Sequence, residues 1–334
     1  MGSIGKRHLR IARELLPTAD IRVLRHELTT HIPEGANGVF FRIDEAIPFR
    51  PEIAVLANPA PFHINVARPL AEIGTHLLIE KPLSINENGV EELNNIALRS
   101  GSKVLVGYNL RYLHSLQHFK KFISEGKCGR VLSVHSVVGQ ELQSWRPEAD
   151  YRRGVSARSD LGGGVLLELS HELDYLRWVF GDVNWTMAVL RKQSKLEIDV
   201  EDSALMIFEF KSINAETPII ANVSLDFVRQ EPTRVCTVVG EEGTLRWDGL
   251  SGSIEHYSAV QKQFIQIYKS TQQAAESYVE EWKDFLFCLN DKTGRFESLN
   301  DGLAVLNIIE AVRESSLTGL RTEVNYTKLN ENNQ

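Results

Sequence analysis

The sequence contains little cysteine and no long apolar run. Its three cysteines, Cys128, Cys236 and Cys288, lie far apart and are odd in number, which argues against a disulfide framework and against a zinc site. No apolar stretch approaches the roughly 20 residues that span a bilayer, and the N-terminus lacks the continuous apolar segment of a secretory signal. These absences predict a cytoplasmic protein with reduced thiols and without a metal site.

Basic residues are not in excess either. The chain has 37 Lys and Arg against 44 Asp and Glu, a formal net charge of -7 at pH 7. Nucleic acids and anionic membranes require a basic surface, so neither is expected as a partner. The length of 334 residues, with 43% hydrophobic residues, is natural for two domains of an ordinary globular protein.

The first hundred residues alternate short apolar runs with helical patterns. We expect helices over Ile4–Leu16, Pro61–Ile73 and Asn86–Arg99, and strands over Ile21–Glu27, Ile53–Ala57, His76–Pro82 and Lys103–Asn109. Asn86 is the expected N-cap of the third helix, and Gly101 its stop. Apolar strands that alternate with helices indicate a parallel sheet covered on both faces.

The pattern changes after Asn109. Longer strands with alternating apolar and polar residues are expected within 130–139, 184–192, 203–210, 219–228 and 233–249, and helices within 113–125, 162–181, 274–290 and 303–316. We therefore predict an α/β fold with two domains. Residues 1–108 form a Rossmann-type parallel sheet that binds a dinucleotide, and residues 109–334 form an α/β domain with a large open mixed or antiparallel sheet.

The chain begins with a glycine pattern before a helix. Gly2 and Gly5, with Ser3 and Ile4 between them, fit the second and third glycines of a G-x-G-x-x-G turn, which places phosphates at a helix N-terminus. The first glycine and the first strand of such a site are absent, so we expect the chain to start inside the motif. Arg25, twenty residues after Gly5, favours NADP over NAD; a solvated strand end is the alternative interpretation.

Two further motifs carry candidate chemistry. Lys81 stands between Glu80 and Pro82 at the carboxyl end of a predicted parallel strand, where open α/β sheets bind ligands, and a cis bond before Pro82 would direct Lys81 into the cleft. The alternative is a surface lysine in a loop. Farther along, His171 has Glu168 three residues before it and Asp174 three residues after it, so an acidic neighbour can tune it as a proton acceptor. The alternative is a core histidine satisfied by a carboxylate.

Together these motifs resemble the Gfo/Idh/MocA oxidoreductase family. The resemblance rests on Gly2–His8, Asn58–His63, Glu80–Pro82, Gly107–Tyr112 and Gly162–Asp174. It implies a Rossmann domain and a second domain whose open sheet often forms the oligomer interface, here of a homodimer or homotetramer. It implies that Lys81 and His171 are the catalytic pair, assisted by Glu168, although the family usually has an Asp four residues before the His.

The resemblance also implies a nicotinamide cofactor, NADP or NAD. The cofactor-binding residues would be Gly2, Ser3, Ile4, Gly5, Arg25, Asn58, His63, Glu80 and Lys81. Oxidation of a secondary alcohol sends a hydride to the nicotinamide and a proton to a base within hydrogen-bond reach. His171 would accept this proton, and Lys81 would stabilise the negative charge that develops on the same oxygen.

The residues before the Gly162–Gly181 helix suggest a substrate. Trp145, Arg146, Tyr151, Arg152 and Arg158 are crowded into one loop, and an aromatic ring beside cations suits a sugar face or an anionic group. We expect substrate contacts from Asn109, Arg111, Trp145, Arg152 and Asp174. The alternative is that the loop arginines form surface ion pairs with Glu148, Asp150 and Asp160.

The sequence therefore predicts an NAD(P)-dependent oxidoreductase that acts on a sugar, a cyclitol or a sugar derivative. The main alternative is a catalytically silent binding or regulatory protein of the same fold, because the nucleotide-binding turn is truncated. A third interpretation within the family is a lyase-like enzyme in which a tightly held nicotinamide is oxidised and reduced in the same cycle.

Overall fold

The computed structural model describes residues 1–25, 31–211, 217–290 and 298–329. Within these residues the chain divides into two compact units. The first comprises Met1–Gly107, Tyr278–Leu303 and Lys328–Gln334, and the second comprises Tyr108–Ser277 and Ala304–Thr327, in each case for the described residues. The assignment of cofactor binding to residues 1–108 and of substrate binding to residues 109–334 stays a prediction.

The first unit contains two parallel sheets. Strands β1 (Arg22–Leu24) and β2 (Gly38–Phe40) form one, and β3 (Ile53–Leu56), β4 (His76–Glu80) and β5 (Val104–Gly107) form the other in that order. In a doubly wound sheet of strand order 3-2-1-4-5-6 these two groups would flank the first strand. Among the described residues, no strand pairs with both β1 and β3, so the two groups are separate sheets. The predicted strand over 21–27 ends at Leu24 in the structure, and its last two residues lie outside the described residues.

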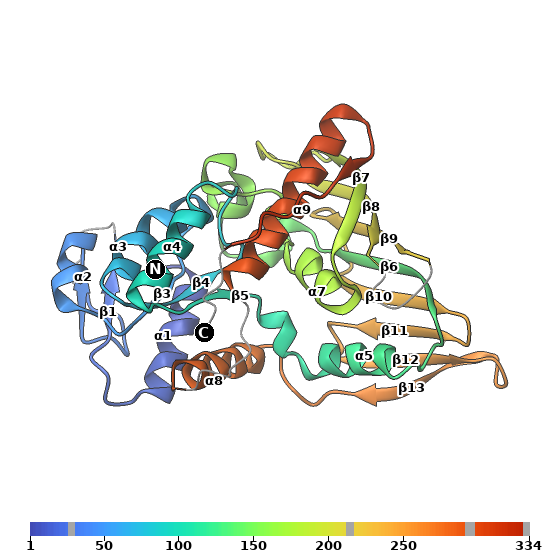
Figure 1. Cartoon of the computed structure of the whole chain (residues 1–334), viewed down its shortest axis with the longest axis horizontal. Helices are drawn as coiled ribbons and strands as arrows, with labels where there is room; N and C mark the ends of the chain where they lie inside the picture. The colour runs from blue at the N-terminus through green and yellow to red at the C-terminus, as the bar shows by residue number, and fades with distance from the viewer. Residues whose placement is uncertain (26–30, 212–216, 291–297, 330–334) are drawn as a thin grey trace. The chain divides into compact units, whose positions relative to one another are not determined.

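Helices cover both faces of the three-stranded sheet (Figure 1). Helices α1 (Ser3–Leu15) and α8 (Glu276–Asn290) lie on one face, and α3 (His63–Glu72) and α4 (Val90–Ser100) on the other. The core on the α1 side joins Ile11, Ala12, Leu78, Leu105, Trp282 and Phe285. Burial of each large apolar side chain of this kind contributes about 1.5–3 kcal/mol. Helix α2 (Ile43–Phe49) follows β2.

The start of α4 differs from the prediction. The helix begins after Gly89, which adopts a left-handed conformation with φ of 76°. The predicted cap, Asn86, instead accepts the N–H of Asn88 at 3.0 Å in the preceding turn. Gly101 ends the helix with φ of 75°, as predicted, because glycine adopts this conformation without steric cost.

The second unit is built on one mixed sheet of nine strands, in the order β13-β12-β11-β10-β6-β9-β8-β7-β14. These strands are β6 (Val131–Gly139), β7 (Val183–Arg191), β8 (Ser203–Phe210), β9 (Ile219–Asp226), β10 (Thr233–Gly240), β11 (Thr244–Asp248), β12 (Ser253–Ser258), β13 (Gln263–Lys269) and β14 (Thr322–Glu323). Strands β6 and β9 are parallel, and the other described pairs are antiparallel. The predicted fold class, a Rossmann-type parallel arrangement followed by a large mixed sheet, is confirmed.

Helices cover one face of the nine-stranded sheet (Figure 1). They are α5 (His114–Ser124), α7 (His171–Phe180) and the part of α9 (Leu299–Thr318) that follows Leu303. Strand β8 shows the consequence: Phe208 and Phe210 are buried, whereas Leu205 and Ile207 are exposed on the opposite face. Among the helices of the described residues, none is long and apolar enough to cross a membrane.

Candidate active site

The first unit places the glycine turn beside the carboxyl ends of two strands. Gly2 precedes α1 in an extended conformation, and no side chain of the described residues caps the helix. A side chain at Gly5 would lie 3.9 Å from Ala57, which follows β3. The first turn of α1 has no acidic residue. A helix N-terminus without acidic groups attracts anions, so this site fits the pyrophosphate of a dinucleotide.

His63 connects the loops that follow β3 and β4. Its Nε2 lies 2.8 Å from the carbonyl oxygen of Asn58, and its Nδ1 lies 3.1 Å from that of Pro82. The side chain is buried, and this burial lowers the pKa of His63 below its usual value. The ring therefore holds the backbone of two predicted site loops together, and a direct contact of His63 or Asn58 with the cofactor stays a prediction.

Glu80 and Lys81 follow at the carboxyl end of β4. The Lys81–Pro82 peptide bond is cis, and the Lys81 side chain is half-buried. Glu80 accepts the backbone N–H of Lys81 through Oε2 at 3.2 Å, and its Oε1 lies 2.7 Å from Nε2 of His8. The glycine turn, Asn58, His63, Glu80 and Lys81 are thus gathered at one end of the first unit. Arg25 follows β1, and its Nε is buried without a hydrogen-bond partner among the described residues.

In the second unit the predicted helix over 162–181 is interrupted, so the expectation of one continuous helix is wrong. The short helix α6 (Val165–Glu168) ends, and α7 begins at His171. Gly164 has φ of 104°, and a Cβ there would lie 2.5 Å from the Oε1 of Glu201. Glu201 accepts the N–H of Leu166 at 3.0 Å, so only glycine fits this approach to the helix.

His171 is half-buried at the first position of α7. The ring of Tyr108 meets it edge-on, with ring centroids 5.8 Å apart. Glu168, on the other side of the interruption, accepts the hydroxyl of Ser156 at 3.0 Å. The break means that Glu168 and His171 do not share one regular helical face, and the assistance of Glu168 stays a prediction.

Two predicted substrate residues pair with each other. Arg111 donates to Asp174 through Nε at 2.9 Å and through Nη2 at 2.6 Å. Both side chains are buried, with 8% and 1% of their surface exposed. A third predicted residue, Asn109, donates to Ser277 Oγ at 2.7 Å. The structure therefore brings the 107–112 motif and helix α7 together through a buried ion pair.

The loop before α6 shows the ion pairs of the alternative interpretation. Arg152 lies 2.8 Å from Asp150, and Arg158 donates to Asp160 at 2.9 Å. Trp145 is half-buried; its indole donates to the carbonyl of Gln140 at 3.2 Å. A substrate contact of Arg152 would have to compete with an exposed carboxylate partner, and it stays a prediction.

Two residues of the first unit were given no role from the sequence. His8 lies within the glycine motif, and Trp282 lies on α8; Trp282 Nε1 donates to His8 Nδ1 at 2.9 Å. The position of His8 inside the glycine motif was a sequence signal that could have marked it as a site residue. No local sequence pattern could have marked Trp282, since its contact with His8 spans 274 residues of sequence.

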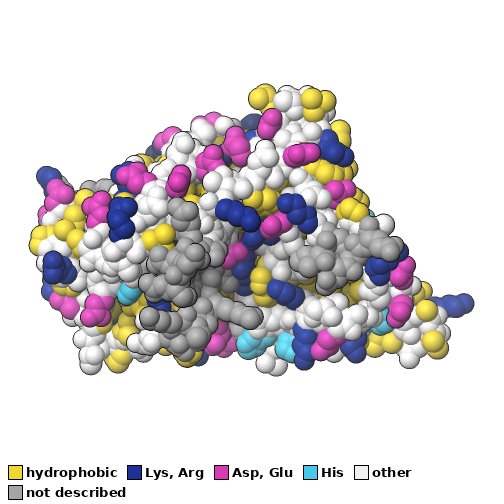
Figure 2. All heavy atoms as spheres, viewed as in Figure 1, with side chains coloured by type: hydrophobic (Ala, Val, Ile, Leu, Met, Phe, Trp, Pro, Cys, Tyr) yellow, Lys and Arg dark blue, Asp and Glu magenta, His cyan; other side chains and the backbone are white. Residues whose placement is uncertain are grey.

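Charges of both signs are mixed on the surface of the molecule. Figure 2 shows Lys and Arg side chains interspersed with Asp and Glu over the face in view. Among the described residues, no group of three His, Cys, Asp or Glu side chains is placed to hold a metal ion. Cys128, Cys236 and Cys288 are buried, and none of them forms a disulfide among the described residues.

Two family models match the chain. Residues 1–108 match "Oxidoreductase family, NAD-binding Rossmann fold", and residues 116–246 match the "GFO/IDH/MocA C-terminal domain". Inositol 2-dehydrogenase 3 of Saccharopolyspora erythraea is 25% identical over 95% of this chain and 91% of its own length. Levoglucosan dehydrogenase of Pseudarthrobacter phenanthrenivorans is 32% identical over 42% of this chain and 36% of its own length.

The solved structures agree on the fold. A levoglucosan dehydrogenase in complex with NADH and levoglucosan superposes with a TM-score of 0.83 at 20% identity, covering 98% of this chain and 97% of that one. The chain spans less than half of the length of several curated relatives that it matches, from 31% to 47%. Since the two family models together cover most of the sequence, the chain belongs to the Gfo/Idh/MocA family of oxidoreductases, as its motifs predict.

Proposed function

We propose that this protein is an NAD(P)-dependent oxidoreductase that acts on a CH–OH group of a sugar, a cyclitol or a sugar derivative. The observation that carries the proposal is the gathering of the glycine turn, Asn58, Glu80 and Lys81 at the end of the first unit where β3 and β4 finish. Ligands of open α/β sheets bind at this end of the strands. Family membership and the printed activities of the levoglucosan and inositol dehydrogenases support the substrate class.

The cofactor would be held at the start of α1. Backbone N–H groups of Gly2, Ser3, Ile4 and Gly5 would bind its pyrophosphate. When bound, the nicotinamide supplies the acceptor or donor of a hydride. His171 would take the proton of the substrate hydroxyl, and Lys81 would stabilise the charge on the same oxygen. These two roles come from the family resemblance, and each residue is half-buried.

The substrate would contact residues of the second unit. We propose that Arg111 and Asp174, whose charged groups bind each other, act as a rigid polar wall, and that Asn109 supports it. Trp145 and Arg152 would supply the aromatic face and the cation of the preceding loop.

A titration of the chain with NADH and with NADPH, followed by cofactor fluorescence, tests the first step of the proposal, which is cofactor binding. Micromolar binding of either supports the enzyme, and binding of neither would favour the silent binding protein.

Cofactor preference is expected to depend on Arg25. Its guanidinium can donate to a 2′-phosphate, and hydrogen bonds to charged groups are worth about 1.5–3 kcal/mol, so Arg25→Asp should weaken NADPH binding about 10-fold to 100-fold and leave NADH binding unchanged or stronger. The matched control is Arg22→Asp on β1, the strand just before Arg25, where the arginine already pairs with Asp20 at 2.7 Å. An unchanged ratio of NADPH to NADH affinity in Arg25→Asp would refute the preference for NADP.

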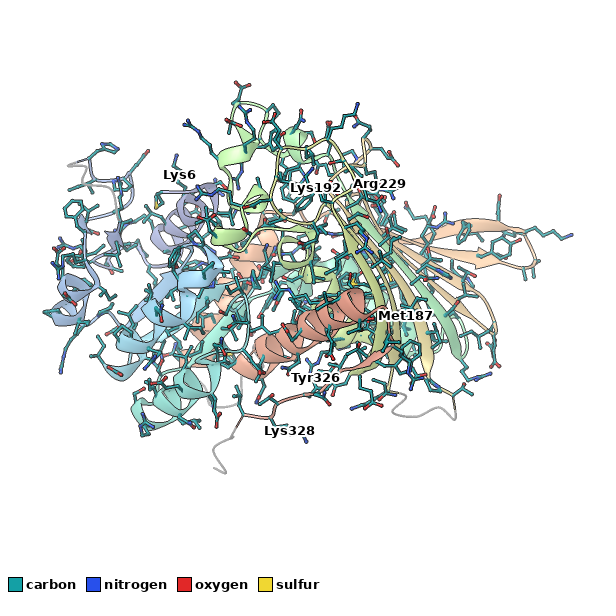
Figure 3. All side chains as sticks on the ribbon, turned by 90° about the horizontal axis from the view of Figure 1, so that it is seen from above. Lys6, Met187, Lys192, Arg229, Tyr326 and Lys328 are labelled. Carbon is teal, nitrogen blue, oxygen red and sulfur yellow. The ribbon has the colours of Figure 1, made fainter. Side chains whose placement is uncertain are left out.

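The open face of the nine-stranded sheet is proposed to join subunits. Met187, Val189 and Leu205 are 49%, 46% and 52% exposed. The pairs Met187–Ile207 and Val189–Leu205 lie opposite each other on β7 and β8, so their side chains form one continuous apolar area. Met187 can be found on β7 in Figure 3. Exposed apolar areas of this kind mark association sites, in agreement with a homodimer or homotetramer.

A double charge on this face should separate the subunits. Leu205→Asp with Ile207→Asp would bury two carboxylates in the interface, so sedimentation should shift from the dimer or tetramer to the monomer. Val260→Asp is the control, because Val260 is 93% exposed between β12 and β13, outside this face. If the wild-type protein sediments only as a monomer, the proposed subunit interface is wrong.

A further inference from the structure

The environment of His8 fixes which of its nitrogens carries a proton. The indole Nε1 of Trp282 lies 2.9 Å from His8 Nδ1. An indole N–H can only donate, so His8 Nδ1 must accept with its lone pair. His8 is buried, with 2% of its surface exposed, and water has little access to compete for this nitrogen.

The other nitrogen of His8 then donates to Glu80. His8 Nε2 lies 2.7 Å from Glu80 Oε1. A neutral imidazole carries one N–H, and the contact with Trp282 leaves that N–H on Nε2. The Glu80 side chain is 9% exposed, and its second oxygen accepts the Lys81 backbone N–H. A buried carboxylate needs such donors, because it has exchanged water for them.

The resulting chain of hydrogen bonds joins three segments of the first unit. Trp282 lies on α8, His8 on α1 three residues after Gly5, and Glu80 at the end of β4. Tyr278, one turn before Trp282, meets the His8 ring edge-on with centroids 6.0 Å apart. The Arg7 guanidinium lies over the Tyr278 ring at 4.4 Å. Helix α8 thus holds the beginning of α1 through two consecutive residues, Arg7 and His8.

We propose that His8 and Trp282 are positioning residues for Lys81. Trp282 on α8 fixes the His8 ring, and His8 donates to the Glu80 carboxylate, which accepts the Lys81 backbone N–H. His8 lies on α1, the helix whose N-terminus would bind the cofactor pyrophosphate. Misplacement of a catalytic group by about 1 Å can cost about 100-fold in rate, so this support has a measurable effect on turnover. The inference rests on the proposed role of Lys81 and adds to it the residues that set its position.

Three variants test the proposal. His8→Leu removes both hydrogen bonds, and kcat should fall about 10-fold to 100-fold, with a smaller change in the KM of the alcohol. His8→Gln can accept from Trp282 and donate to Glu80, so it should restore kcat to within about fivefold of the wild type. Trp282→Phe keeps a ring but removes the N–H, and should give an intermediate kcat. Its matched control is Trp247→Phe, which loses a buried indole bond of 3.0 Å to Ser115 in the second unit and should leave kcat unchanged.

Two measurements separate positioning from simple stability. In a Lys81→Ala background, His8→Leu should lower kcat no further, because the residue through which it acts is gone. The ¹⁵N shifts of the His8 imidazole should show only the Nε2–H tautomer in the wild type. In Trp282→Phe they should show a mixture of the Nε2–H and Nδ1–H tautomers. If Lys81→Ala leaves turnover unchanged, the proposed function itself fails. If Lys81→Ala abolishes turnover while His8→Leu does not lower it, or if the two losses add, only the positioning role is overturned.

Discussion

Replacing His171 with alanine is expected to lower kcat about 10²–10⁴-fold, the range that a positioned general base contributes. Lys81→Ala is expected to cost about 10²–10³-fold, because it removes a cation from the oxygen on which charge develops. Both losses should appear in kcat more than in KM, since each interaction strengthens in the transition state. The measurement is steady-state turnover of a sugar or cyclitol found by screening, followed by NAD(P)H absorbance.

Controls distinguish lost chemistry from lost structure. Cofactor titration of His171→Ala should give the wild-type affinity, because His171 is not one of the proposed cofactor-binding residues. His114→Ala and Lys192→Ala replace exposed residues of the same types and should keep full turnover. The wild-type rate of alcohol oxidation should fall as the pH is lowered, because the base must be unprotonated, and His171→Ala should lose this dependence. Turnover within a few-fold of the wild type in both site variants would reject the mechanism.

Patterns repeated along the chain predicted most of the elements. The apolar run before Lys81 forms the parallel strand β4, and it is apolar throughout because helices cover both of its faces. The alternation in residues 203–210 is a strand with one covered face. Helix α5 begins one residue from its predicted start. In each case several consecutive residues carry the same periodic signal, and the packing that buries them follows it.

Short or locally ambiguous segments were not predicted. Strand β2 has three residues and begins with a glycine, so it is too short to show an alternation of apolar and polar residues. The interruption between α6 and α7 occurs at Leu169–Ser170, without a proline or glycine to indicate it. The start of α6 is likewise set by a distant residue, since Glu201 accepts the N–H of Leu166 and leaves no room for a Cβ at Gly164. A single sequence carries no local trace of such a constraint.

The candidate site was predicted as a set of residues but not as a set of contacts. Asp174 was expected beside His171 on one helical face, and its two oxygens instead bind Arg111, which is 63 residues away in sequence. Glu80 was expected near the cofactor, and it accepts from His8 across 72 residues. Spacing along one helix limits which neighbours are possible. Tertiary packing decides which partner a buried charge has, because a charged group that has lost its water must form hydrogen bonds with whichever donors lie beside it in the fold.

The pair of Arg111 and Asp174 should dominate the stability of the second unit. Arg111→Met leaves the Asp174 carboxylate, 1% exposed, without its two charged hydrogen bonds. Breaking a buried ion pair from one side costs about 3–5 kcal/mol. For a unit of this size about 2–4 °C in Tm corresponds to each kcal/mol, so Tm should fall by roughly 6–20 °C. Thermal unfolding followed by tryptophan fluorescence measures the change.

A double variant shows whether the loss of stability comes from the Asp174 carboxylate that Arg111→Met leaves unpaired. Arg111→Met with Asp174→Leu removes both charges, and it should recover most of the lost stability, because a buried ion pair contributes little more than apolar residues of similar volume. Arg130→Met, which breaks the exposed pair with Glu241, should cause a much smaller change. A double variant as unstable as Arg111→Met would mean that the fold needs the shape of this pair rather than its charge balance. A kinetic measurement separates the role of the pair in stability from its role in substrate binding. If Arg111 and Asp174 also contact the substrate, the double variant should have a raised KM for the alcohol even where its stability is restored.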